Sequence, residues 1–312
     1  MKRDLSLVGF VLVCLILSGC MAPPVIDPIT ADYAVRRVTY ATVDGENLQF
    51  DVFWPRGEGP FPMVINFHGG SWTKTNQEIF PEPMCKWLSN RGYTVFNVSY
   101  RLAPRHQFPA QINDGLGAVI YIKEHAAEYN GDPTRVAIMG DSAGGNLAAM
   151  VALCWNDPYF KPTYAGNGKA TAETQAAVLL FPVLDIVNLH GMFGPYVIVE
   201  DPKAIAEAYI GGPPSTMLET YKKASPMFLA RKDISPVLVV CGKDDPLLPQ
   251  AEQFKKKLDD LGATNGLYVA CGETHGFTAI PFNKGAVDAY NAIAAFLDLE
   301  LRHLRPRAAS KP

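Results

Sequence analysis

Ser142 lies in a segment whose residue types and spacing are suited to nucleophilic chemistry. The segment is Gly140-Asp141-Ser142-Ala143-Gly144-Gly145, between an apolar run and a helix-like stretch. A serine on such a tight strand-to-helix turn has an exposed hydroxyl, and Gly140 and Gly144 flank it because any Cβ there would clash. A serine hydroxyl is a weak nucleophile unless a base removes its proton and a third group orients that base. The pattern therefore predicts that Ser142 is a nucleophile with a carboxylate and a histidine further along the chain.

Both partners follow in the expected order. Asp244 and Asp245 come after one later apolar run, and His275 comes after the next. Of the two carboxylates we choose Asp245 by its place in the motif, directly before Pro246, and Asp244 remains the alternative. In this assignment His275 is the general base, and Asp245 orients its ring.

Acyl transfer also requires hydrogen-bond donors for the oxyanion, and a glycine-bearing loop after an earlier apolar run can supply them. The loop is His68-Gly69-Gly70-Ser71-Trp72. We expect the backbone N–H groups of Gly70 and Ser71, together with that of Ala143, to form the oxyanion hole. His68 is expected to orient the loop through hydrogen bonds, whereas Trp72 either lines the pocket or packs in the core.

Short apolar runs alternate with helix-like segments over most of the chain and predict the framework that positions these residues. Asp44-Gly45 joins the first two strands as a hairpin turn. The later runs are nearly unbroken, as expected for parallel strands covered on both faces. The predicted strands are 37–42, 48–54, 63–67, 94–98, 136–139, 177–181, 237–240 and 267–269; the predicted helices include 79–90, 110–129, 143–154, 250–261 and 285–304. This order predicts a doubly wound α/β sheet.

Two longer segments interrupt the alternation. Residues 155–173 are polar and contain Gly and Pro, and residues 186–225 form a long connection with a predicted helix at 202–210. Unstructured loops of such length are uncommon unless they are functional. We therefore predict a small lid at 186–225, within a catalytic domain that spans 36–305 and precedes a tail at 306–312.

Residues 1–19 have the pattern of a secretory signal, because a basic start precedes an apolar run well short of the about 20 residues that span a bilayer. The run ends in Leu17-Ser18-Gly19-Cys20, which resembles the lipobox of bacterial lipoproteins. That resemblance implies a lipidated Cys20 as the mature N-terminus, and the Pro-rich residues 20–35 then form a tether. We expect a lipid-anchored protein of the bacterial cell envelope, in the outer membrane on its periplasmic or surface face. The alternative is an ordinary or uncleaved signal with an accidental cysteine.

Charge and cysteine spacing exclude other classes of partner. The chain has 28 Lys and Arg against 31 Asp and Glu, without a basic run, which argues against nucleic-acid binding. Its cysteines have neither CxxC nor His/Cys metal spacing, so we expect no metal site. Cys241 and Cys271 could form a disulfide on neighbouring strands. We favour buried free thiols for them and for Cys85 and Cys154.

Five motifs in this order resemble the hormone-sensitive-lipase-like branch of the α/β-hydrolase carboxylesterases. They are residues 68–72, 100–104 with 108–110, 140–145, 245–247 and 275–277. The resemblance covers about residues 38–301 and implies an α/β-hydrolase fold with a mostly parallel eight-stranded sheet and helices on both faces. It also implies a Ser142–His275–Asp245 triad that hydrolyses small or short-chain carboxylic esters without a cofactor.

Single residues within these motifs carry further implications. His68, Gly69 and Asp141 match the family pattern around the site, whereas Ser71 stands where the family usually has a third glycine. The serine still has a backbone N–H, but its added side chain could narrow the pocket or shift the substrate preference. We also predict a scaffold ion pair between Arg101 and Asp114.

The sequence thus predicts a membrane-tethered serine esterase that forms an acyl-enzyme. One alternative is an amide hydrolase resembling kynurenine formamidase, which shares the His-Gly-Gly-x-Trp loop. Asp141 and residues 100–104 favour the esterase. Another alternative is a catalytically silent, surface-tethered binding module, since fold does not imply function. The presence of every triad and oxyanion position argues against that module.

Overall fold

The computed structural model describes residues 33–74, 82–189, 201–280 and 283–302. Within these ranges the strands form one eight-stranded sheet in the order β1-β2-β4-β3-β5-β6-β7-β8. The strands are β1 Tyr33–Val43, β2 Glu46–Trp54, β3 Phe61–Phe67, β4 Thr94–Val98, β5 Gly131–Asp141, β6 Ala176–Leu180, β7 Val237–Gly242 and β8 Asn265–Ala270. The helices of eight residues or more are α1 Glu82–Ser89, α2 Ala110–Glu124, α3 Ala143–Cys154, α4 Pro202–Ile210, α5 Pro214–Lys223, α7 Leu248–Leu261 and α8 Lys284–Leu297.

The sheet begins with the predicted hairpin and continues as a parallel array. Asp44 and Gly45 both have left-handed φ angles, 52° and 78°, as a tight two-residue hairpin turn requires. β2 pairs antiparallel with β1 and β4, and all later neighbours pair in parallel. β1 already begins at Tyr33, so residues 33–35, predicted as tether, pair with β2 instead.

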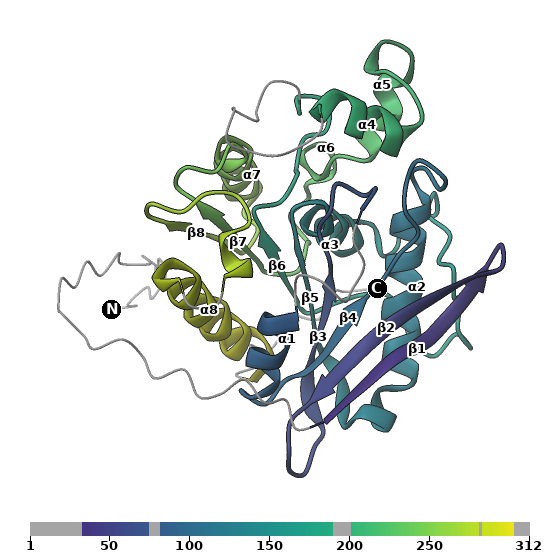
Figure 1. Cartoon of the computed structure of the whole chain (residues 1–312), viewed down its shortest axis with the longest axis vertical. Helices are drawn as coiled ribbons and strands as arrows, with labels where there is room; N and C mark the ends of the chain where they lie inside the picture. The colour runs from purple at the N-terminus through teal and green to yellow at the C-terminus, as the bar shows by residue number, and fades with distance from the viewer. Residues whose placement is uncertain (1–32, 75–81, 190–200, 281–282, 303–312) are drawn as a thin grey trace, which may run out of the picture.

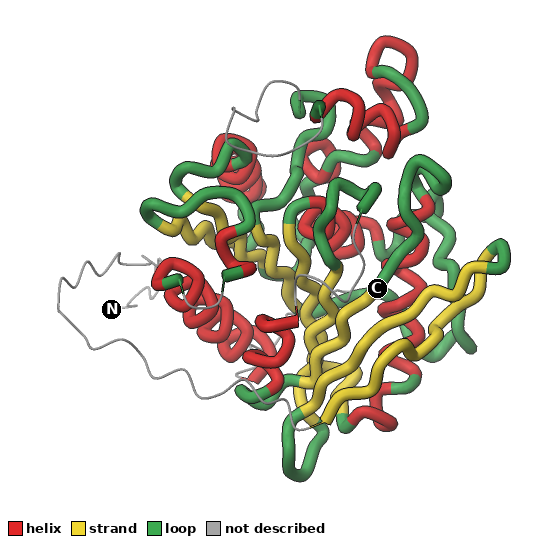
Figure 2. The backbone as a smooth tube through the Cα atoms, in the orientation of Figure 1, coloured by secondary structure: helices red, strands yellow, loops and turns green. Residues whose placement is uncertain are grey.

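Helices cover both faces of the sheet, which explains the unbroken apolar runs of its central strands. Figure 2 shows one twisted sheet with helices in front of it and behind it. In Figure 1, α1 and α8 lie side by side in front, where the rings of Trp87 and Tyr290 are 5.2 Å apart, and α2 lies behind β1 and β2. Every residue of β4, β6 and β7 is buried. The predicted doubly wound α/β sheet is confirmed.

In two segments the regular α-helix ends several residues before the end predicted from the sequence. The segment predicted as one helix over 110–129 ends at Glu124 and continues as a 3₁₀ turn from Ala126 to Tyr129. The segment predicted as 285–304 is helical to Leu297 and then widens into a π-helical turn that reaches Arg302. In both cases the apolar pattern continues past the end of the regular helix.

The candidate lid contains the helices α4 and α5 in its described part, and the short α6 (Pro226–Leu229) follows directly after it. α4 matches the helix predicted at 202–210: the Asp201 side chain caps its start by accepting from the Lys203 N–H, and Gly211, with φ of 100°, ends it. α5 and α6 follow, at the top of Figure 1. Residues 190–200 of this segment lie outside the described ranges.

The N-terminal predictions fall outside the described residues. Residues 1–32 and 303–312 are not described, and they include the signal, Cys20, most of the tether and the tail. Among the residues that the structure describes, no helix is both long and apolar enough to cross a bilayer.

The cysteines in the described ranges are free thiols. Cys85, Cys154 and Cys241 are buried, as predicted, whereas Cys271 is exposed, which corrects the prediction for that residue. Cys241 lies within β7 opposite Val269 of β8, but Cys271 follows the end of β8 and faces solvent in the turn beyond it.

Candidate active site

Ser142 lies on a strained turn between β5 and α3. Its φ and ψ are 52° and −114°, a conformation that L-residues rarely adopt. The turn is crowded: a Cβ at Gly140 would collide with the Gly144 backbone, and a Cβ at Gly144 would collide with the Phe67 carbonyl. The two glycines therefore permit the sharp turn that raises the Ser142 side chain above the sheet edge, as the sequence motif predicted.

His275 lies between Ser142 and Asp245. Its Nε2 is 3.1 Å from the Ser142 Oγ, and its Nδ1 is 3.0 Å from the Asp245 Oδ2. Asp245 is buried, and its other carboxylate oxygen accepts the Leu247 N–H at 2.8 Å. Asp244 is exposed on the same turn. Of the two candidate carboxylates, the structure therefore brings Asp245 against the imidazole.

The loop predicted to bind the oxyanion has three consecutive left-handed residues. The φ angles of Gly70, Ser71 and Trp72 are 109°, 56° and 59°. The Gly70 carbonyl accepts the N–H groups of Thr73 and Lys74, which closes the loop into a tight turn. Ser71 thus occupies a conformation that favours glycine, which gives a physical reason for the glycine that the family usually has there.

Ala143, the third predicted donor, is the first residue of α3 and is buried next to Ser142. The first N–H groups of a helix have no partner within that helix. The N-terminus also has a partial positive charge, which favours a negative ligand. Gly70 and Ser71 line the same cavity as Ser142, and Ala143 directly follows Ser142 at the start of α3.

Asp141 connects the nucleophile turn to the oxyanion loop. Its Oδ1 accepts the Gly69 N–H at 2.9 Å, and its side chain lines the cavity. Burial raises the pKa of Asp141 from 3.8 to about 6, although the Gly69 N–H and the nearby His275 oppose the shift. The carboxylate therefore holds the loop while carrying a charge in a poorly hydrated place.

His68 contacts the backbone of the oxyanion loop from a buried position. Burial lowers the pKa of its imidazole from 6.5 to about 4, so the ring is neutral near pH 7. Its Nδ1 is 2.7 Å from the Gly69 carbonyl, and its ring stacks on Tyr100 with centroids 4.4 Å apart. The Tyr100 hydroxyl donates to the His68 carbonyl at 2.8 Å. These contacts agree with the orienting role predicted for His68.

Trp72 packs in the core, which decides between the two alternatives left by the sequence. Its side chain is buried and stacks on Tyr209 of α4, with centroids 4.3 Å apart and planes 4° from parallel. The Tyr209 carbonyl accepts the Phe108 N–H at 2.9 Å. α4 of the candidate lid is therefore packed directly on the oxyanion loop.

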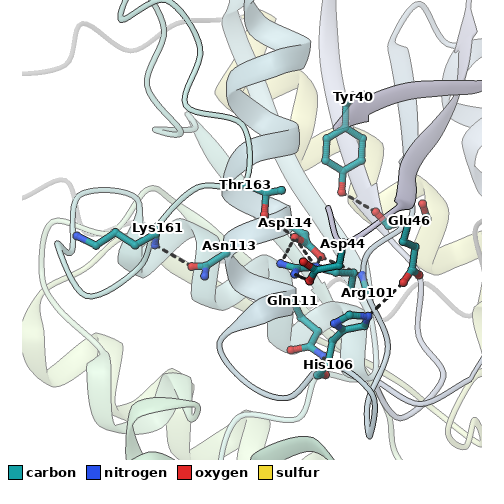
Figure 3. Close-up of polar contacts among 11 residues, drawn as sticks. Tyr40, Asp44, Glu46, Arg101, His106, Gln111, Asn113, Asp114, Lys161 and Thr163 are labelled. Carbon is teal, nitrogen blue, oxygen red and sulfur yellow. Dashed lines mark hydrogen bonds and ion pairs between the residues drawn. The ribbon is translucent and has the colours of Figure 1, made fainter. Parts of the chain in front are cut away.

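The predicted ion pair of Arg101 and Asp114 is present (Figure 3). The guanidinium donates from Nε at 2.9 Å and from Nη2 at 2.8 Å, and the Arg101 backbone N–H also donates to this carboxylate. The Thr163 hydroxyl adds a fourth bond at 2.5 Å. Because the Ala103 N–H donates to the Trp72 carbonyl at 2.9 Å, this buried network anchors a segment that supports the oxyanion loop.

A cavity of about 230 Å³ opens beside Ser142. It is lined by residues at which sequence reasoning predicted no functional role: Asn66, Met84, Leu180, Phe181, Thr278 and Ala279. They come from separate parts of the chain and meet only in the folded protein. Phe181 carried one signal, because it is an aromatic residue at the end of a predicted strand, at the edge where ligands bind in α/β sheets.

No group of three or more His, Cys, Asp or Glu side chains in the described ranges is arranged to hold a metal ion.

The raised pKa of Asp141 predicts how Asp141→Asn changes stability with pH. Below about pH 4 the carboxyl is protonated in both the folded and unfolded states and costs nothing. Between about pH 4 and pH 6 the unfolded state gives up its proton while the folded state keeps it, so the free energy of unfolding falls, and above about pH 6 the loss is complete. The neutral amide avoids this cost and still accepts the Gly69 N–H. We expect the variant to be more stable than the wild type by about 2 kcal/mol at pH 8, a figure that allows for screening of the carboxylate charge by water in the cavity.

Urea unfolding at pH 4 and pH 8 measures this difference. Asp244→Asn, which changes an exposed carboxylate, is the matched control and should change neither midpoint. Equal stabilisation of Asp141→Asn at both pH values would contradict the proposed cause.

The fold and the site define the class. A mostly parallel eight-stranded sheet carries a serine after β5, a carboxylate after β7 and a histidine after β8, which is the chain order of the α/β-hydrolase fold. The chain belongs to the BD-FAE family, whose model matches residues 50–258.

Several proteins are similar to this chain. The Mycobacterium tuberculosis protein named probable carboxylic ester hydrolase LipM is 30% identical over 261 residues, which are 81% of this chain and 57% of that protein. The Pyrobaculum calidifontis esterase is 26% identical with a TM-score of 0.74, and the alignment covers 86% of both chains. EstE1, a carboxylesterase cloned from a metagenomic library, is 27% identical with a TM-score of 0.74, over 87% of this chain and 90% of that one.

These similarities confirm the predicted relationship to α/β-hydrolase carboxylesterases. The chain spans about half the length of the curated relatives it matches, 57% of LipM and 49% of the M. tuberculosis esterase LipQ.

Proposed function

We propose that the protein is a serine esterase that hydrolyses small or short-chain carboxylic esters. The observation that carries the proposal is the hydrogen-bonded series of Ser142, His275 and Asp245, of which Ser142 and His275 line a cavity. Similarity to carboxylic ester hydrolases supports the same reaction class.

In the proposed mechanism, the Ser142 Oγ attacks the ester carbonyl while His275 Nε2 takes the hydroxyl proton. Asp245 holds the imidazole in the required tautomer and stabilises the imidazolium that forms. Collapse of the tetrahedral intermediate breaks the bond to the alcohol, which leaves with the proton from His275. Water then attacks the acyl-enzyme, gives its proton to His275, and releases the carboxylic acid and free Ser142.

The N–H groups of Gly70, Ser71 and Ala143 are the proposed donors to the oxyanion. The loss of one such donor typically costs about 3 kcal/mol of transition-state stabilisation. The contacts of Asp141 and His68 with the Gly69 backbone support this loop in place before substrate binds. Such preorganisation avoids a reorganisation cost during the reaction.

The size and the lining of the cavity favour a substrate with a small acyl or alcohol group. Its volume is about 230 Å³, and Met84, Leu180 and Phe181 contribute apolar surface to its lining. An apolar wall with few polar groups favours uncharged ester substituents.

A substrate panel tests the reaction class. Protein lacking residues 1–20 is assayed on p-nitrophenyl esters from acetate to decanoate and on N-formylkynurenine, with a p-nitrophenyl phosphonate as a covalent probe. We expect turnover that is highest for the shorter esters and a phosphonyl adduct on the Ser142 peptide in mass spectra. Selective turnover of the formamide would instead support an amidase, and neither turnover nor adduct would support a silent binding module.

We further propose that Cys20 is lipidated and tethers the enzyme to the bacterial cell envelope. The support is the sequence alone: a basic start, a short apolar run, and the Leu17-Ser18-Gly19-Cys20 segment. More than one acyl chain is needed for stable anchoring, and the acyl chains of a mature lipoprotein meet that requirement.

Cys20→Ala is expected to abolish metabolic labelling with a fatty acid and to release the protein from its lipid anchor. Fractionation of cells that express the full chain measures both effects, and Cys14→Ala, within the predicted signal, is the matched control. Continued fatty-acid labelling of Cys20→Ala would exclude this attachment site.

A further inference from the structure

Phe181 is held in an unusual backbone conformation beside the proposed nucleophile. It directly follows β6, and its φ of 34° lies in the left-handed region. A large side chain with positive φ is a genuine outlier, and strain of this kind persists where the surrounding structure enforces it, often at functional sites. The surroundings of Phe181 should therefore reveal what the strained conformation achieves.

Hydrogen bonds fix the backbone of residues 180–183 against the nucleophile turn. The Phe181 N–H donates to the Val240 carbonyl at 2.6 Å. The Leu180 carbonyl accepts the Ser142 N–H at 2.9 Å, and the Val183 N–H donates to the Ser142 carbonyl at 3.4 Å. The segment that carries Phe181 thus contacts the Ser142 backbone on both sides of the residue.

The Phe181 ring meets the His275 ring edge to face. The centroids are 4.9 Å apart, the planes lie at 67°, and Phe181 is only 2% exposed. The Phe181 ring also contacts the ring of Phe277, with centroids 6.0 Å apart. One strained residue therefore contacts both the turn that carries Ser142 and the imidazole that must receive its proton.

The two hydrogen bonds of His275 define distances more sharply than they define the plane of the ring. Nδ1 lies 3.0 Å from the Asp245 Oδ2, and Nε2 lies 3.1 Å from the Ser142 Oγ. Hydrogen bonds keep most of their strength while the angle at the hydrogen stays above about 150°. A modest tilt of the imidazole therefore changes both distances little but turns the Nε2 lone pair away from the serine proton. The packed Phe181 ring restrains this tilt, because aromatic pairs prefer particular edge-to-face arrangements.

We propose that Phe181 is a positioning residue that fixes the tilt of the His275 imidazole relative to Ser142. This inference rests on the proposed function, since it assigns Phe181 an action through the general base. The strained φ directs the Phe181 ring toward His275, and the hydrogen bonds of residues 180–183 keep that direction.

Phe181→Leu tests the proposal, because leucine keeps an apolar side chain but removes the ring. We expect kcat on p-nitrophenyl acetate and butyrate to fall by about 10- to 100-fold, as for a small misplacement of a reacting group. KM should stay within about twofold for both esters, because ground-state binding is not the property that changes.

Phe181→Tyr keeps the ring, and its hydroxyl can extend into the adjoining cavity, so it should restore most of kcat. Phe160→Leu, which removes a buried ring that packs on Phe108, is the matched control for lost packing.

A measurement without turnover separates this inference from the proposed function. The low-field proton resonance of the His275 N–H that bonds to Asp245 should be sharp in the wild type and in Phe181→Tyr, and broadened or shifted in Phe181→Leu. The inference is overturned if Phe181→Leu keeps that resonance and its kcat while KM rises with acyl length, because Phe181 is then a wall of the acyl pocket. A kcat loss equal to that of Phe160→Leu, with the resonance unchanged, also overturns it. Failure of the esterase proposal appears separately, as equal hydrolysis by wild type and a serine variant.

Discussion

Ser142→Ala is expected to lower kcat for p-nitrophenyl acetate by about 10⁶-fold, to a rate set by the remaining oxyanion donors and by substrate binding. Removal of the Oγ removes the atom proposed to form the acyl-enzyme, and His275 then loses the hydroxyl from which it would take a proton. The methyl side chain fits the same turn, because the backbone hydrogen bonds of Ser142 to Leu180 and Val183 do not involve the hydroxyl. The circular dichroism spectrum and the unfolding midpoint should therefore stay close to those of the wild type.

Initial rates over a range of enzyme concentrations measure the effect, with correction for spontaneous hydrolysis of the ester. Ser235→Ala is the matched control, since its buried hydroxyl has no partner among the described residues. It should retain full activity. Hydrolysis by Ser142→Ala at the rate of the wild type would refute the serine mechanism altogether.

The second large effect concerns the choice between two adjacent carboxylates. Asp245→Asn is expected to lower kcat by about 10⁴-fold, because a neutral amide cannot stabilise the imidazolium and can hold the ring in the wrong tautomer. The amide oxygen can still accept the Leu247 N–H, so the turn after β7 should keep its shape. Asp244→Asn should stay within about threefold of the wild type, because that exposed side chain lies away from the transition-state charge.

The pair of variants is informative because the two residues share a turn and a side-chain type. Steady-state kinetics of both proteins on one ester provide the comparison. A larger loss for Asp244→Asn would reverse the assignment of the acid. Similar small losses for both variants would mean that His275 needs no carboxylate partner.

The framework of this protein could be predicted from the sequence because parallel strands covered on both faces are apolar along their whole length. The runs at 63–67, 94–98 and 177–181 are cases in point, and β3, β4 and β6 coincide with them to within two residues. The motif positions also placed Ser142 and His275 correctly at the ends of their strands. Asp245 was chosen by motif position alone, and the structure brings this carboxylate against the imidazole.

Other features depend on packing between distant segments and had no local signal. The burial that raises the pKa of Asp141 arises where β5 meets the oxyanion loop, which no spacing rule reveals. The positive φ of Phe181 follows from hydrogen bonds to two other strand ends. Trp72 offered two interpretations, and only its contact with Tyr209, far along the chain, decides between them.

The stack of Trp72 on Tyr209 has a consequence for how such enzymes diversify. α4 belongs to the candidate lid and packs on the loop that carries the proposed oxyanion donors. A change of the lid sequence therefore also changes the packing that supports this loop. An exchange of residues 186–225 between homologues would replace Tyr209 and so remove its nearly parallel stack on Trp72. We therefore expect homologues with new substrate ranges to have replaced residues 186–225 and the residue at position 72 together. A chimera that exchanges residues 186–225 but keeps Trp72 should lose turnover on every ester alike.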